Sequence, residues 1–135
     1  MAIRKKCLVD TSVIIALLRK NEQAREVLSS MLQDNAFVCD ITILEVLAGC
    51  SSVEKRSLAE SALEVYGQLT NNGVISSRAI QLMKRYCIRR AEQPPLLLPD
   101  CLIASYALYY DLELLTFNKK DFAYIHGIKI HSLSR

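Results

Sequence analysis

The segment LVDTSVII at residues 8–15 constrains the fold of this chain more than any other. An apolar run stops at a single carboxylate, Asp10, and the polar pair Thr11 and Ser12 opens a second apolar run. This pattern is typical of a buried strand that delivers an acid to the start of a helix, with Thr11 or Ser12 as the helix cap. The fold and the function then depend on whether other acids reach the same place.

The rest of the chain alternates short apolar runs with amphipathic helical patterns. Strands that alternate with helices form a parallel sheet covered on both faces. We therefore predict an α/β fold, a three-layer α/β/α sandwich around a mainly parallel sheet of about four or five short strands. The predicted strands span residues 7–9, 36–39, 74–75, 113–117 and 128–131, the predicted helices span 11–19, 42–49, 52–69, 76–90 and 99–110, and a further helix begins at residue 21.

Composition and length indicate one domain over residues 1–135, since 51% of the residues are hydrophobic and 23% are charged. No apolar run approaches the roughly 20 residues that a membrane span needs. In the N-terminal segment MAIRKKCLVD an acid stands where a signal peptide would continue its apolar core, so we expect a cytoplasmic protein. Five cysteines, an odd number without a CxxC pair, favour buried thiols over disulfides or a zinc site.

Three of the 14 acidic residues, Asp10, Glu45 and Asp100, stand among apolar neighbours where a strand or loop passes into a helix. The carboxyl ends of parallel strands form one edge of a sheet, and ligands bind there at the switch in strand order. Three separate crossovers would therefore carry these acids to the same edge. Asp121, which follows the strand ending near Thr116, would be a fourth acid at this edge.

Each of these acids also has a simpler explanation. Asp10 can be a helix cap, and Thr42 with Glu45 fits the T-x-x-E capping box. The negative charge of Asp100 can interact favourably with a helix dipole, and Asp121 can start a turn. Taken together these explanations lose weight, because capping requires no burial, whereas each acid adjoins a hydrophobic run.

Acids gathered in this way would repel one another and raise one another's pKa unless a cation lay between them. Carboxylate ligands suit Mg²⁺ or Mn²⁺ better than zinc. A divalent ion with open water positions promotes attack on a phosphodiester, because it lowers the pKa of bound water and stabilises charge on the phosphate. The net charge is +3, so with four acids around a cation the remaining surface is basic and favours a polyanion.

Four segments, LVDTSVII, TILEVLAG, LPDCLIASYAL and LLTFNKKDF, occur in this order over nearly the whole chain. Together they resemble the PIN domain and, in chain size, the VapC toxins of bacterial and archaeal toxin–antitoxin pairs. The resemblance implies an endoribonuclease that depends on Mg²⁺ or Mn²⁺, with an RNA substrate, a homodimeric state and an antitoxin that blocks the site. It further implies that the metal-binding and catalytic acids are Asp10, Glu45, Asp100 and Asp121, with Thr11, Thr116 and Asn118 as polar support.

The fourth segment leaves two arrangements of the site open. Many PIN domains carry an acid two residues after the threonine, where this chain has Asn118, and Asp121 lies three residues further on. Either Asp121 is the fourth ligand, or the site has three acids with Asn118 as a polar or water-mediated partner. Lys119 and Lys120 beside this position either contact RNA phosphate or are solvated turn lysines.

Two other functions compete with a nuclease. A PIN-like domain that has lost catalysis could hold RNA or a protein partner, an alternative motivated by Asn118. A phosphotransfer enzyme with Asp10 as nucleophile, like the haloacid dehalogenase-like phosphatases, requires a second acid two residues later, where this chain has Ser12. The exposed parts of residues 14–18 and of the helix predicted at 52–69 are the expected surfaces for dimer and antitoxin contacts.

Overall fold

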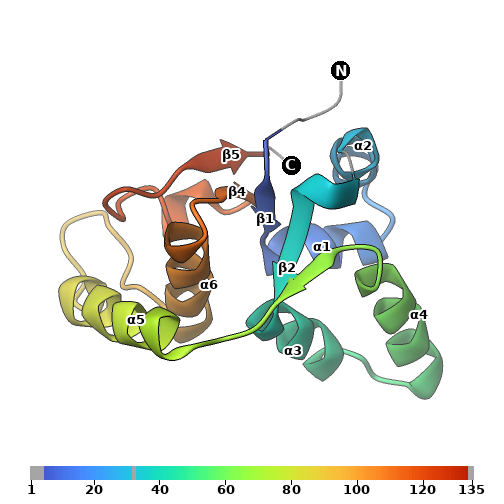
Figure 1. The fold of residues 1–135 in the computed structure, drawn as a ribbon, viewed down its shortest axis with the longest axis horizontal. Coiled ribbons are helices and arrows are strands. Elements are labelled where there is room, and N and C mark those ends of the chain that lie inside the picture. The colour runs from blue at the N-terminus through green and yellow to red at the C-terminus, as the bar shows by residue number, and fades with distance from the viewer. Residues whose placement is uncertain (1–4, 32, 134–135) are drawn as a thin grey trace.

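The computed structural model describes residues 5–31 and 33–133, in which five strands form one parallel sheet (Figure 1). The strands span Cys7–Val9 (β1), Ala36–Cys39 (β2), Gly67–Leu69 (β3), Glu113–Thr116 (β4) and Ile130–Ser132 (β5). Their order in the sheet is β3-β2-β1-β4-β5. The chain therefore builds outward from β1 first on one side and then on the other, and the strand order switches between β1 and β4. Open α/β sheets bind ligands beyond the carboxyl ends of the strands at such a switch.

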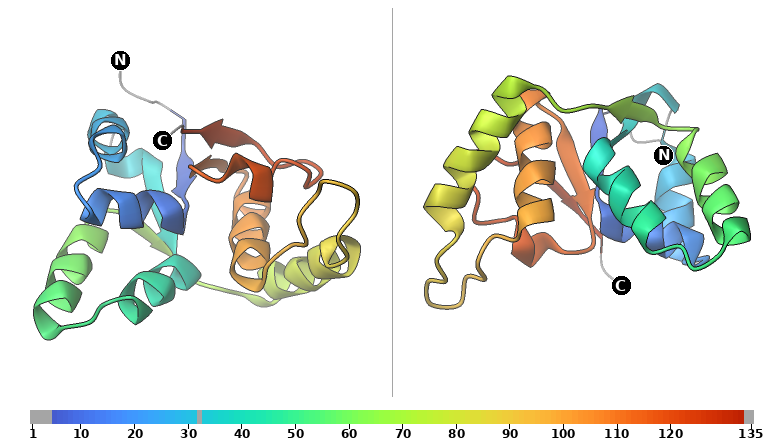
Figure 2. Two further views of the ribbon diagram at one scale, coloured as in Figure 1. Left: turned by 180° about the vertical axis from the view of Figure 1, so that it is seen from behind. Right: turned by 90° about the horizontal axis from the view of Figure 1, so that it is seen from below.

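Helices lie on both faces of the sheet (Figure 2). One face is covered by α5 (Gly73–Tyr86) and α6 (Leu98–Tyr109). The other face carries α1 (Thr11–Leu18), α2 (Glu22–Ser30) and α4 (Val53–Leu63). Helix α3 (Asp40–Ala48) begins directly after β2, at the carboxyl edge of the sheet. No helix in the described part of the chain is both long enough and apolar enough to cross a bilayer.

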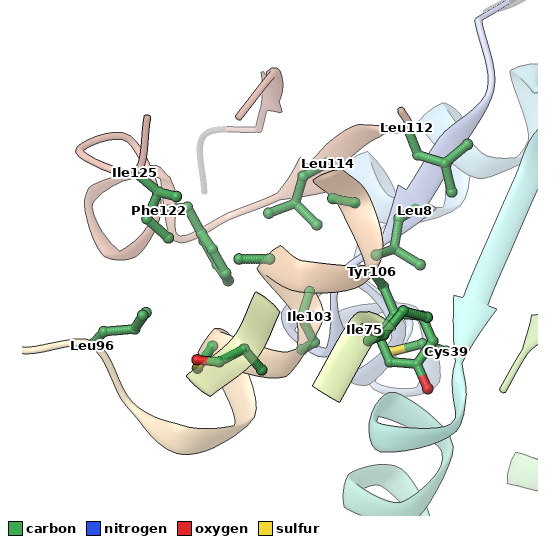
Figure 3. Close-up of a cluster of buried hydrophobic side chains, with 14 of the residues drawn as sticks. Leu8, Cys39, Ile75, Leu96, Ile103, Tyr106, Leu112, Leu114, Phe122 and Ile125 are labelled. Atoms are coloured by element: carbon green, nitrogen blue, oxygen red, sulfur yellow. The ribbon is translucent and has the colours of Figure 1, made fainter. Parts of the chain in front are cut away.

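The central strands bury alternate side chains in two separate cores. Leu8 and Leu114 pack with the α5–α6 side, and Figure 3 shows both in that cluster. Val9 and Leu115 pack in the other cluster, beneath α1, α2 and α4. Successive residues of a strand point to opposite faces, so short strands with apolar residues at every position require cover on both sides. The predicted three-layer α/β/α fold with a parallel sheet is confirmed, and the sheet has five strands.

The third strand lies elsewhere than the sequence predicted. Residues 74–75 belong to α5, whose first turn is capped by Asn72, because the Asn72 side chain accepts a hydrogen bond from Ile75 N at 2.9 Å. The strand β3 instead falls inside the helix predicted at 52–69, which ends at Leu63. Gly67 allows this, since a Cβ at that position would lie 2.6 Å from the Cδ1 atom of Phe37 on β2.

Candidate metal centre

Asp10 stands at the carboxyl end of β1 and is the N-cap residue of α1, yet its side chain makes no capping bond. Only 3% of the residue is exposed. Its Oδ2 atom accepts hydrogen bonds from Ser12 Oγ and from Thr116 Oγ1, both at 2.7 Å. Burial raises the pKa of the Asp10 carboxyl, and the bonds from Ser12 and Thr116 oppose that rise. Hydroxyl donors therefore hold the carboxylate in place, and backbone N–H groups of Thr11 and Ser12 at the start of α1 also lower its pKa.

The two hydroxyls that hold Asp10 are themselves fixed by the backbone after β4. Asn118 N donates to Thr116 Oγ1 at 2.9 Å, and Phe117 N donates to Ser12 Oγ at 3.3 Å. Each hydroxyl thus accepts a hydrogen bond from a backbone N–H and donates one to the Asp10 carboxylate. This arrangement joins the ends of the two strands that flank the switch in strand order.

Glu45 is held in a similar way from the start of α1. Thr11 Oγ1 lies 2.8 Å from Glu45 Oε1 and 3.0 Å from Thr42 Oγ1. A hydroxyl has one hydrogen, and the carboxylate is the stronger acceptor, so Thr11 donates to Glu45. The capping-box interpretation of Thr42 and Glu45 is wrong, because α3 begins at Asp40 and Thr42 is fully buried in its first turn.

Asp100 lies in the first turn of α6, a position where a helix dipole favours a negative charge. Its pKa is nevertheless raised to about 7, first by burial and then by the charges of Asp10, Asp121 and Glu45. Burial and like charge therefore outweigh the dipole. The other three predicted acids, Asp10, Glu45 and Asp121, therefore act on Asp100 through their charge.

A cavity of about 510 Å³ opens at this edge of the sheet. It contains three of the four acids together with Thr11 and Asn118, and its full lining is Asp10, Thr11, Ser12, Ile15, Ala16, Arg19, Asn21, Glu45, Asp100 and Asn118. Asp121 ends the short 3₁₀ helix η2 (Lys119–Asp121) and does not line the cavity, although its charge acts on Asp100. Lys119 and Lys120 are exposed on the same turn, outside the lining. Both Asn118 and Asp121 therefore remain candidates for the fourth ligand of the proposed metal site.

The donor set fits a hard divalent cation. The side chains that meet here are carboxylates, hydroxyls and amides, whose oxygen atoms are the ligands that Mg²⁺ and Mn²⁺ prefer. Within residues 5–31 and 33–133, no three His, Cys, Asp or Glu side chains are placed so as to hold one ion between them. A cation here would therefore contact no more than one or two of the acids directly and would keep water in its other positions, as Mg²⁺ commonly does. The pKa of Asp100 is raised by burial and by neighbouring negative charge, so a bound cation would relieve that repulsion.

Four cavity or support residues are not predicted as site residues from the sequence: Ser12, Thr42, Arg19 and Asn21. Ser12 and Thr42 carry a signal only through their closeness to Thr11 and Glu45, and helix capping explains the same pattern. Arg19 is the one basic residue among those that line the cavity, and its side chain forms no hydrogen bond or ion pair with the described residues. No local pattern marks it, because its place depends on where α1 ends.

Comparison with known proteins gives one family. The sequence model of the PIN domain matches residues 7–127. No curated protein matches the sequence.

Solved structures share the fold along nearly the whole chain. A toxin–antitoxin complex from Klebsiella pneumoniae contains a chain that is 26% identical, with a TM-score of 0.76 over 95% of this chain and 100% of that one. A DNA-bound VapBC from Salmonella typhimurium gives 23% identity and a TM-score of 0.79 over 95% and 98% of the two chains. VapBC-1 from nontypeable Haemophilus influenzae gives 23% identity and a TM-score of 0.73 over 93% and 96%.

Proposed function

This chain belongs to the PIN domain family, and from that premise we propose that it is a metal-dependent endoribonuclease that cleaves RNA phosphodiester bonds. We further propose that it is the toxin of a toxin–antitoxin pair, a single PIN-like domain over residues 1–135 that acts in the cytoplasm. One observation carries the enzymatic part of the proposal. Asp10, Glu45 and Asp100 line one cavity at the switch in strand order, where burial and the other acids raise the pKa of Asp100 to about 7.

Asp10, Glu45 and Asp100 would hold Mg²⁺ or Mn²⁺, one or two of them directly and the others through bound water, with Asp121 as the fourth acid or Asn118 as a polar partner in its place. When bound, the ion would activate water as a nucleophile and stabilise negative charge on the phosphate. The hydroxyl groups of the chain have a separate task. Thr116 and Ser12 fix the direction of the Asp10 carboxylate, and Thr11 fixes that of Glu45. Such outer partners orient ligands and raise metal affinity.

Positive charge near the acids supports an RNA substrate. Arg19 lines the acidic cavity, and Lys119 and Lys120 follow Asn118 on an exposed turn. Lysine and arginine contacts to phosphate position a nucleic acid without reading its sequence. We propose that these side chains hold the phosphates on either side of the cleaved bond.

A neighbouring groove supports an antitoxin that blocks the site. It has a volume of about 500 Å³ and shares Ile15, Arg19 and Glu45 with the acidic cavity. The rest of its lining comes from α1, α3 and α4 and the turn after α3, with Leu18, Val46, Gly49, Cys50, Lys55, Leu58 and Ala59. Leu58 is 70% exposed, so α4 offers apolar surface to a partner. An antitoxin segment bound in this groove would reach the acids directly.

A homodimer is also part of the proposal. Apolar side chains of α5, of the start of α6 and of the segment between these helices are exposed, among them Ile80, Ile88, Leu97 and Leu98. Ile80 and Leu98 also line a mainly apolar cavity of about 480 Å³ between α5 and α6, and exposed apolar patches are typical of protein interfaces. Light scattering after size exclusion tests this part, and a monomer at micromolar concentration would contradict it.

RNA cleavage by purified protein in Mg²⁺ or Mn²⁺ tests the enzymatic proposal. We expect the wild-type protein to cut RNA, chelation of the metal to stop it, and Asp10→Ala to lose at least about a hundredfold in rate. Cleavage by Asp10→Ala at the wild-type rate would contradict the proposal. Sequencing the 5′ ends of the fragments would identify the target.

The alternative of an inactive PIN-like module that only binds RNA or protein is favoured by Asn118, which stands where many PIN domains have an acid. Calorimetry with Mn²⁺ separates the two functions. Uptake of metal by the wild-type protein supports the nuclease, whereas RNA binding without metal uptake or cleavage supports the module.

A further inference from the structure

A buried tyrosine connects two helices that each carry an acid of the candidate metal centre. The Tyr106 hydroxyl on α6 donates a hydrogen bond to the Oδ1 atom of Asp40, the first residue of α3. Tyr106 is 0% exposed, and Figure 3 shows its ring in the cluster that also contains Ile75 and Cys39. Burial raises the pKa of Tyr106, and the bond to Asp40 raises it further, so the phenol stays protonated as the donor.

The Asp40 carboxylate is fixed through both of its oxygen atoms. Its Oδ2 atom accepts a hydrogen bond from Asn71 N at 3.3 Å, in the turn between β3 and α5. Asp40 also stands in the first turn of α3, where the helix dipole favours a negative charge. Each oxygen atom therefore has a donor from a different element, and rotation of the side chain would break both bonds. The acceptor of the Tyr106 hydroxyl is thus held firmly in place.

Other groups hold α6 to its second neighbour, α5. Ser105, the residue before Tyr106, donates from Oγ to Ile75 O at 2.7 Å. That bond does not set the distance between α6 and α3. Among the described residues, the bond from Tyr106 to Asp40 is the one side-chain hydrogen bond between these two helices.

The helices that this bond joins carry Glu45 and Asp100. Glu45 follows Asp40 by five residues and Asp100 precedes Tyr106 by six, so each acid lies about 7–9 Å from the bond along its helix axis. Glu45 and Asp100 both line the acidic cavity, whereas Asp40 and Tyr106 do not. When both acids are ionised and no cation is bound, their like charges push α3 and α6 apart. A hydrogen bond between the two helices opposes that repulsion.

We propose that Tyr106 and Asp40 are positioning residues of the metal centre, and that their hydrogen bond holds α3 and α6 at the spacing at which Glu45 and Asp100 act on the same cation, directly or through water. This inference rests on the proposed metal-dependent function. Neither residue lines the cavity, so the bond acts on metal affinity through the positions of the two helices. Binding sites require such support, because a ligand displaced by a fraction of an ångström holds its cation less well.

The variant Tyr106→Phe tests the inference, because it removes the hydroxyl and keeps the ring in the core. We expect the Mn²⁺ dissociation constant, measured by calorimetry, to rise about three- to tenfold, less than the roughly ten- to hundredfold typical of direct partners of metal ligands. The matched control is Ser105→Ala, which removes an equally buried hydrogen bond that holds α6 to α5. Urea unfolding should show a similar loss of stability in both variants. Only Tyr106→Phe should lose Mn²⁺ affinity.

The variant Asp40→Ala, alone and combined with Tyr106→Phe, shows whether the tyrosine acts through Asp40. We expect Tyr106→Phe to add no further loss of Mn²⁺ affinity in the Asp40→Ala background. An unchanged dissociation constant in Tyr106→Phe, an equal loss in Ser105→Ala, or the same loss in both backgrounds would overturn the inference.

The wild-type protein separates this inference from the proposed function. Wild-type protein that binds Mn²⁺ but leaves RNA uncut would contradict the proposed nuclease, and the affinity of Tyr106→Phe would still decide the role of the bond. Wild-type protein that takes up no Mn²⁺ would contradict both. Cleavage of RNA with unchanged Mn²⁺ affinity in Tyr106→Phe would support the nuclease and overturn the inference alone.

Discussion

The two halves of the acidic site are built differently. Asp10 and Glu45 each accept hydrogen bonds from threonine or serine hydroxyls that the surrounding backbone holds in place. Asp100 and Asp121 accept none from the side chains of the described residues, and their contact with the rest of the site is electrostatic. In the proposed metal centre the first half is therefore arranged without a cation, whereas the second half would gain most from one.

Burial affects the two halves in the same direction, so the hydroxyls account for the difference. Burial is the largest cause of the raised pKa for both Asp10 and Asp100. The causes that follow it lower the pKa of Asp10, because they are hydrogen bonds, and raise that of Asp100, because they are other acids. The position of the hydroxyl donors therefore determines which acids of the proposed metal site are preorganised.

Among changes that leave all four acids in place, removing one hydroxyl donor from the first half gives the largest expected effect. In Thr116→Val, Asp10 loses a bond of 2.7 Å and Asn118 N loses its acceptor, while the shape of the side chain is kept. We expect Mn²⁺ affinity and RNA cleavage to fall by about ten- to a hundredfold. The control is Thr70→Val, an exposed threonine, which should match the wild type in both assays. A Thr116→Val protein with wild-type metal affinity would mean that the two halves do not differ in preorganisation.

We expect Asp100, in the second half of the site, to make the free energy of unfolding of the metal-free protein depend on pH. The pKa of the Asp100 carboxyl rises from an ordinary value of 3.8 to about 7 in the folded protein. The folded protein therefore holds this proton at pH values where the unfolded chain has released it. The resulting stability is complete below about pH 4 and is lost as the pH rises toward 7. We expect a decrease on the order of 1–2 kcal/mol over this range, after allowance for solvent screening.

Urea unfolding of EDTA-treated protein at several pH values measures this decrease, and Asp100→Asn removes the titrating group. The difference between wild type and variant isolates Asp100 from Asp10, whose pKa is raised in the same direction. In saturating Mg²⁺ the trend should reverse, because metal ligands must be deprotonated. Identical pH profiles for the wild type and Asp100→Asn would show that burial and neighbouring acids do not raise the pKa of Asp100 in the folded protein.

The difference between the halves also explains what the sequence could predict. Asp10, Glu45 and Asp100 stand out because a charged side chain inside an apolar run is costly, and parallel strands end at a common edge. The place of Asp121 is not visible in this way, because it depends on the course of the turn after Asn118. The support from Thr42 is hidden for a different reason. A T-x-x-E pattern is local and fits a helix cap, whereas the actual contact joins α3 to Thr11 on α1.

The third strand shows the same limit in the fold. Gly67–Leu69 has no apolar run of its own, and its pairing with β2 depends on a glycine that faces the ring of Phe37. Residues 74–75 are β-branched and so favour a strand, but Asn72 caps a helix there. Strand propensity is a weak signal where a helix cap competes with it.

The smallest expected effect concerns the positive charges beside the two halves. Arg19, on the Asp10 side, lines the cavity, whereas Lys120, on the Asp121 side, stands outside it. If Arg19 contacts phosphate, Arg19→Ala raises the KM for RNA by about three- to tenfold, with kcat kept, and reduces the salt dependence of binding by about one charge. Lys120→Ala should raise KM by a smaller factor, about twofold, because Lys120 lies on an exposed turn outside the cavity, where solvent screens its contact with phosphate.

Arg89→Ala, an exposed arginine that does not line the cavity, controls for the loss of net charge in both variants. Steady-state cleavage of a short RNA at several salt concentrations measures KM, kcat and the salt dependence together. A larger effect on KM from Lys120→Ala than from Arg19→Ala would place the RNA on the Asp121 side. The half of the site without hydroxyl donors would then be the half that binds the substrate.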